Sequence, residues 1–194
     1  MPKLSEIKVA ASPWRPLSVE ERRKAASVAA NLVSRVDFVT DWRLQKSYYL
    51  AEVWSIEERL CRLSEVEFAS WTHGPWSLHV REAEEALEAD GLVDRVRQKA
   101  KRRPEAEFLR INQRSKVPPL GYADEEFLDS FAAQIKYTDG DTLTKIAKST
   151  VPFQSTKPED LVDLDGYLQA LKKKHERFVH SPKVAKLVAQ AKAG

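Results

Sequence analysis

Apolar residues recur at three- and four-residue steps along most of the chain, which is the spacing of one face of an α-helix. The first such run follows Ser18 and Glu21, whose types and separation match a capping box at the start of a helix. Similar runs cover residues 78–90, 124–137 and 143–147. The pattern therefore predicts a mainly α-helical protein.

The same spacing continues into the C-terminal part of the chain. Residues 156–159 match a second capping box, and residues 161–178 carry leucines at three- and four-residue steps after it. Another apolar run covers residues 181–191. We therefore expect two helices after residue 156.

The run at residues 42–60 differs from the others because apolar side chains surround it on most sides. A helix of this kind is buried in the core. Lys46 lies within it and has two interpretations: its stem covers the core while the ammonium reaches water, or the ammonium contacts a partner. We expect the first.

Glycines divide the middle of the chain. Gly74 and Pro75 force a turn, after which Ser77 is suited to cap the next helix. That helix ends at Gly91, which suits the left-handed position beyond a helix C-terminus. The two glycines therefore bound a short helical unit.

Two runs of β-forming residues follow, at 92–98 and 107–112, and predict a hairpin. The predicted fold is a compact helical domain, mainly α, with one small β-hairpin. Its order of helix, turn and hairpin resembles a winged helix. We divide the chain into an N-terminal arm and helix (1–36), the helical domain (37–155, with the hairpin at 92–112) and a C-terminal helical extension (156–194).

Composition limits the cellular setting and the partners. The hydrophobic share of 42% is enough for one core, and the net charge of +3 does not point to nucleic acid or membrane. The N-terminus lacks the apolar segment of a signal peptide, and no stretch reaches the roughly 18 apolar residues of a membrane span. A single cysteine, Cys61, excludes an intrachain disulfide. We expect a soluble cytoplasmic protein.

Catalytic patterns are missing from the sequence. The four histidines have no cysteine or carboxylate at a metal-ligand spacing, and the six glycines form no phosphate-binding loop. Cys61 has no evident activating base, and runs of carboxylates such as Glu84 and Glu85 are typical of a solvated helix face. We expect no enzyme activity, no metal and no cofactor.

Positive charge concentrates at the hairpin. Residues 92–118 hold nine cations and three anions. This surface is suited to a nucleic-acid backbone or an acidic protein, or it is only a soluble hairpin tip, which is the commonest case. The candidate contacts to nucleic acid or an acidic partner are Arg95, Arg97, Lys99, Lys101, Arg102 and Arg103.

Three sequence motifs together resemble the Panacea domain, the SocA-type antitoxin domain of bacterial and phage toxin–antitoxin systems. The motif residues, which we expect to be structural, are Leu44, Gln45, Lys46, Tyr48, Phe68, Trp71, His73, Gly74 and Pro75. Residues 150–153 are a weaker version of the family's closing Thr-x-x-Pro-Trp segment. This chain departs from the family pattern at Phe153, where tryptophan is usual, and at Trp76, where a small aliphatic residue often stands.

The resemblance implies a non-enzymatic domain that neutralises a cognate protein toxin by direct binding. It also implies that toxins paired with such domains differ widely, so that specificity lies outside the shared motifs. The candidate toxin contacts form a C-terminal stripe of Leu161, Leu164, Leu168, Leu171 and Phe178, with Lys172 and Lys173 beside it. The alternative that this stripe packs on the domain stays open.

Two other functions also stay open. A DNA-binding autorepressor would use the basic hairpin, and an adaptor would present a bound toxin to a protease.

Overall fold

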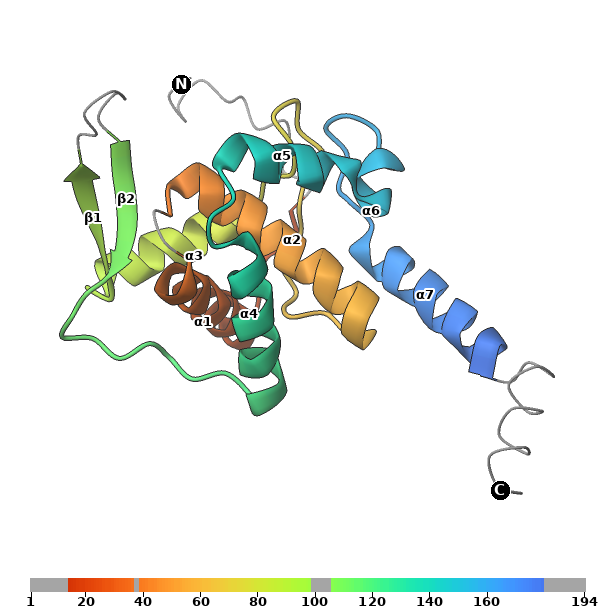
Figure 1. The fold of residues 1–194 in the computed structure, drawn as a ribbon, viewed down its shortest axis with the longest axis horizontal. Helices are drawn as coiled ribbons and strands as arrows, with labels where there is room; N and C mark the ends of the chain where they lie inside the picture. The colour runs from red at the N-terminus through yellow and green to blue at the C-terminus, as the bar shows by residue number, and fades with distance from the viewer. Residues whose placement is uncertain (1–13, 37–38, 99–105, 180–194) are drawn as a thin grey trace.

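The computed structural model describes residues 14–36, 39–98 and 106–179, and it confirms a mainly helical protein with one small hairpin (Figure 1). In chain order the elements are α1 (Val19–Arg35), α2 (Asp41–Arg59), α3 (Leu78–Ala89), β1 (Val93–Gln98), β2 (Ala106–Ile111), α4 (Tyr122–Ile135), α5 (Gly140–Ser149), α6 (Val151–Gln154) and α7 (Leu164–Val179). The predicted final helix at 181–191 lies outside the described residues.

Helix α2 occupies the centre of the protein, with α1, α3, α4, α5 and α7 packed against it (Figure 1). Its residues from Arg43 to Val53 are all buried, whatever their polarity. The Thr40 hydroxyl caps its start by accepting from the Arg43 amide. The prediction of a buried helix is therefore confirmed for the central part of α2.

Helices α1 and α3 pack against each other on one side of α2. The predicted capping box at Ser18 and Glu21 is present, and Ser77 caps α3 by accepting from the Val80 amide. Buried alanines and valines of α1 belong to the same core cluster as α2. The described part of the N-terminal segment thus shares one core with the rest of the chain.

The hairpin lies at one end of the protein, beyond α3. Strands β1 and β2 are antiparallel, with Val93 opposite Ile111 and Arg95 opposite Leu109. Gly91 precedes β1 with φ of 66°, the left-handed conformation predicted for it. Val93 and Leu109 are buried, so one face of the hairpin closes the core.

The start of the C-terminal helix differs from the prediction. Residues 157–160 form a turn and not a helical start, and α7 begins at Leu164. The reason is backbone pairing: the Glu159 amide donates to the Ser70 carbonyl (2.6 Å) and the Val162 amide to the Phe68 carbonyl (2.7 Å). These long-range hydrogen bonds hold the segment against the corner motif, where the local sequence favours a helix.

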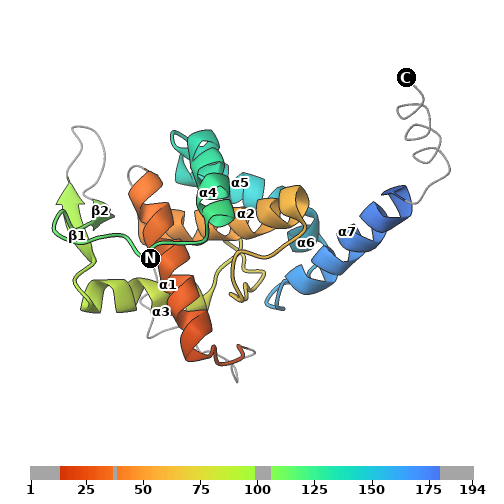
Figure 2. The same cartoon turned by 90° about the horizontal axis from the view of Figure 1, so that it is seen from below.

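Helix α7 leaves this turn and projects away from the body, at the opposite end from the hairpin (Figures 1 and 2). Among its described side chains, those of the first half pack on the protein: Leu164 and Leu168 join the core, and α7 contacts α2. The packing of this half therefore attaches α7 to the body of the protein.

We expect Leu168→Ala to lower the free energy of unfolding by about 2–4 kcal/mol, because it removes a buried side chain that attaches α7 to the core. The exposed neighbour Gln169→Ala is the matched control and should change stability by less than about 0.5 kcal/mol. Urea unfolding of both variants measures the difference. Equal stability of the two variants would contradict the packing role of Leu168.

Candidate functional site

A tight turn, which we call the corner (residues 68–77), carries the second motif of the sequence. Ala69 and Trp76 pair as an antiparallel bridge, with the Ala69 amide 2.8 Å from the Trp76 carbonyl oxygen. Gly74 closes the turn with φ of 91°, a conformation that side chains disfavour. A Cβ atom there would lie 3.3 Å from Thr144 Cγ2 and 3.4 Å from Lys46 Cε. The corner is therefore packed closely against α2 and α5.

Lys46 joins α2 to the corner. Its side chain is fully buried, and the Nζ atom donates to the Pro75 carbonyl oxygen at 2.6 Å and lies 4.0 Å from the centre of the Trp42 ring. Burial, and secondly the charge of Lys148, lowers the pKa of Lys46 to about 7. The expectation that the ammonium reaches water is wrong, because the Pro75 carbonyl and the Trp42 ring hold it inside.

Gln45 makes a second connection between the same two segments. Its Nε2 donates to the Ser77 carbonyl (3.0 Å), and its Oε1 accepts from the Ser77 amide (2.8 Å). The side chain thus satisfies both backbone groups of the residue that caps α3. Gln45 and Lys46 together fix where the corner ends and where α3 begins.

The remaining motif residues pack around these two connections. Leu44 and Tyr48 are buried in the core, and the Phe68 ring lies 6.1 Å from that of Tyr48 and 5.2 Å from that of Tyr49. The two motifs, which are twenty residues apart from Tyr48 to Phe68, therefore form one structural unit. Trp71 and His73 differ from the other motif residues, because they lie on the outside of this unit.

Aromatic rings surround the corner on its outer side. The His73 ring lies 5.9 Å from Trp42 and 6.4 Å from Trp71, and Trp71 lies 5.8 Å from Trp76. The three tryptophans are half-buried and His73 is exposed. Among the described residues Trp54 packs against the hydrophobic core, whereas Trp42, Trp71 and Trp76 lie outside that cluster.

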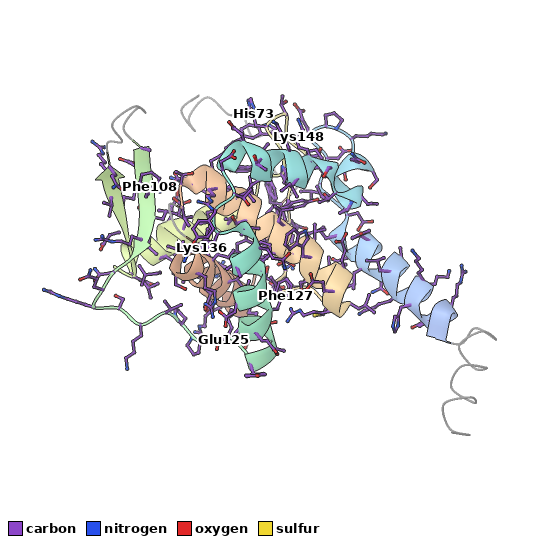
Figure 3. All side chains as sticks on the ribbon, in the orientation of Figure 1. His73, Phe108, Glu125, Phe127, Lys136 and Lys148 are labelled. Atoms are coloured by element: carbon purple, nitrogen blue, oxygen red, sulfur yellow. The ribbon has the colours of Figure 1, made fainter. Side chains whose placement is uncertain are left out.

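The side chain of Lys148, on α5, also reaches the outer side of the corner. Its Nζ donates to the Thr72 carbonyl (3.2 Å), and the side chain is exposed. Figure 3 shows His73 and Lys148 close together on the same side of the protein. We call Trp42, Trp71, His73, Trp76 and Lys148 the corner surface. The sequence did not reveal it, because Trp42 and Lys148 reach the corner from distant helices.

The predicted hairpin contacts have a different environment. Arg95 is half-buried and makes ion pairs with Glu84 and with Asp41 (2.8 Å). Burial and the Asp41 carboxylate raise the pKa of Glu84, while Arg81 and Arg95 oppose this. Arg95 therefore neutralises a buried carboxylate between the hairpin, α2 and α3, rather than facing a partner.

Arg97 is the most exposed of the described candidate contacts on the hairpin. Its side chain is 73% exposed and pairs with Glu107 at 2.7 Å. Lys99, Lys101, Arg102 and Arg103 lie outside the described residues.

The C-terminal stripe, predicted to contact a toxin, lies mostly against the protein. Leu164 and Leu168 are buried, Leu171 is half-buried, and Leu161 pairs with Ala69 of the corner. Lys172 is half-buried and Lys173 is exposed, whereas the Phe178 side chain lies outside the description. The leucines of the stripe therefore pack on the domain, which is the alternative that the sequence left open.

No group of histidine, cysteine or carboxylate side chains in the described residues is arranged to hold a metal ion. The described part of the chain also contains no helix both long and apolar enough to cross a membrane. Cys61 is half-buried, and its carbonyl accepts from the Ser55 hydroxyl (2.8 Å). The arrangement at the corner therefore offers hydrogen-bond donors and aromatic rings, which are suited to binding.

We expect Arg95→Ala to destabilise the protein by about 3 kcal/mol, because it leaves the buried Glu84 carboxylate without its hairpin partner. Arg97→Ala removes an exposed ion pair and should cost less than about 1 kcal/mol. Thermal and urea unfolding of the two variants measure this difference. Equal effects would show that the Arg95 pair is not structural.

A scan against protein-family models, a search of curated proteins and a search of solved structures each find no match to this chain.

Proposed function

We propose that this chain is an antitoxin of the Panacea type, which neutralises a cognate protein toxin by binding it directly. The observation that carries the proposal is the meeting of the two motifs: Lys46 and Gln45 of α2 hydrogen-bond to the backbone of Pro75 and Ser77. A family would share these residues because they contact each other across the fold and hold its parts together. The proposal explains the buried motif residues as a scaffold.

A neutralising protein needs a rigid surface and no chemistry. The corner supplies rigidity, because side-chain hydrogen bonds, an antiparallel bridge and a glycine turn fix its backbone. Half-buried tryptophans beside it supply contact area of the kind that dominates protein–protein binding energies. This combination favours a protein-binding module over an enzyme.

The autorepressor alternative depends on the basic hairpin. Its order after α3 is that of a winged helix, but Arg95 is engaged in ion pairs within the protein. A repressor would have to bind DNA through Arg97 and the neighbouring cations outside the described residues. We therefore favour a protein partner.

To test the antitoxin proposal, the adjacent reading frame is expressed alone and together with this chain. If the proposal is correct, the neighbouring product stops growth when expressed alone, growth returns with co-expression, and the two proteins co-purify in a stable complex. A neighbouring product that is harmless, or that is toxic yet neither rescued nor bound, would contradict the proposal.

Promoter binding by the purified chain, measured at two salt concentrations, distinguishes the repressor. Sequence-dependent, salt-sensitive binding without any binding to the toxin would favour that alternative.

A further inference from the structure

The tryptophans of the corner surface are partly exposed and do not contribute to the hydrophobic core. Trp42, Trp71 and Trp76 are half-buried and lie outside the core cluster, although tryptophan has the largest apolar area to bury. Tryptophan is also the residue most enriched at binding hot spots. A cluster of three beside an exposed histidine therefore points to an interaction surface.

Hydrogen-bond donors predominate on this surface. The Trp42 indole donates to Thr144 Oγ1 (3.2 Å), whereas the indole N–H groups of Trp71 and Trp76 have no acceptor among the described residues. Lys148 adds an ammonium at the edge of the rings, and one acceptor, the Thr72 carbonyl, lies next to it. The complementary partner presents acceptors.

The positive charge beside the corner also favours a partner that presents acceptors, in particular anionic ones. Within the described residues, neither the Lys46 nor the Lys148 ammonium has a carboxylate within ion-pair distance, although most buried or half-buried cations elsewhere in the protein do. Lys148 lies close enough to Lys46 to lower its pKa. The exposed Lys148 ammonium, which has no carboxylate at ion-pair distance in the described part of the chain, is therefore available to an anionic group.

The geometry of the rings favours a peptide over a nucleic acid. His73 meets Trp42 at an interplanar angle of 67° and Trp71 at 88°, both edge to face, and Trp71 is tilted by 49° to Trp76, so none of these ring pairs is parallel. Bases stack on exposed, parallel ring faces, and a strand of nucleic acid also needs a series of cations along its backbone. A partner side chain with a carboxylate needs only one cation and the free indole donors.

We propose that the corner surface is the docking site for an acidic segment of the partner protein, whose carboxylates contact Lys148 and the indole donors of Trp71 and Trp76. This inference rests on the proposed function, in that the partner is a protein. It assigns recognition to the corner surface (Trp42, Trp71, His73, Trp76 and Lys148) rather than to the C-terminal stripe. Apolar side chains of the same segment would pack on the tryptophan rings.

The test uses the full chain and a short fluorescein-labelled peptide that alternates Glu and Leu, with the Gln–Leu peptide as its uncharged counterpart. Fluorescence anisotropy should show that the acidic peptide binds at least about tenfold more tightly than the Gln counterpart. We expect Lys148→Glu to weaken binding by at least about tenfold, because it reverses the charge that meets the carboxylates. The exposed Lys145→Glu on the same helix is the matched control and should change Kd less than about twofold.

Trp71→Ala should weaken binding by about thirtyfold, the size of a hot-spot truncation. Circular dichroism and thermal unfolding verify that Trp71→Ala folds. If it does not fold, Lys148→Glu, which is at an exposed position, still tests whether the corner surface binds the acidic peptide. Equal binding of the two peptides, unchanged binding by Lys148→Glu, or tighter binding of a single-stranded oligonucleotide of equal charge would overturn the inference.

The same two variants separate this inference from the proposed function. Loss of toxin binding by Lys148→Glu with a normal fold supports the docking site. Full neutralisation by both variants overturns the docking site and leaves the antitoxin function standing. If the unaltered chain binds no toxin, the proposed function fails, and the peptide measurement still decides whether the corner surface binds acidic segments.

Discussion

The hydrogen bond from the buried Lys46 ammonium to the Pro75 carbonyl is the constraint on which the rest of this structure depends. An ammonium without water is costly unless it is well paired, and here one carbonyl and the face of the Trp42 ring replace the solvent. The pKa of Lys46, lowered to about 7 mainly by burial, is the sign of that cost. The corner must stay closed against α2 to keep this charge satisfied.

The closed corner determines the other features of this end of the protein. Gln45 holds Ser77 so that it caps α3, and the backbone of Phe68 and Ser70 pairs with the segment that leads to α7. The rings of Trp71, His73 and Trp76 lie outside the core cluster, on the side of the corner where Lys148 of α5 donates to the Thr72 carbonyl. Buried structural residues and the half-buried or exposed residues of the proposed docking site are thus neighbours in one motif.

Local signals in the sequence predicted much of the fold. The capping residues Ser18 and Ser77, the apolar surround of α2 and the glycine before β1 each act over a few residues, and each takes its expected place. Long-range contacts account for the differences. Residues 157–160 pair with the corner instead of starting a helix, and the ammonium of Lys46 finds a carbonyl that its own helix does not reveal. The corner surface was missed for the same reason, since its members come from α2, α5 and the corner.

Direct titration of Lys46 tests this account most directly. Nuclear magnetic resonance of the chain labelled with ¹³Cε-lysine, with the Lys46 signal assigned by its absence in Lys46→Met, follows the ammonium through its loss of a proton. The account predicts a midpoint near pH 7 for this signal, because the ammonium is buried in the closed corner. A midpoint near the ordinary lysine value of 10.5 would mean that the ammonium is in water, and would contradict the closed corner on which the proposed surface depends.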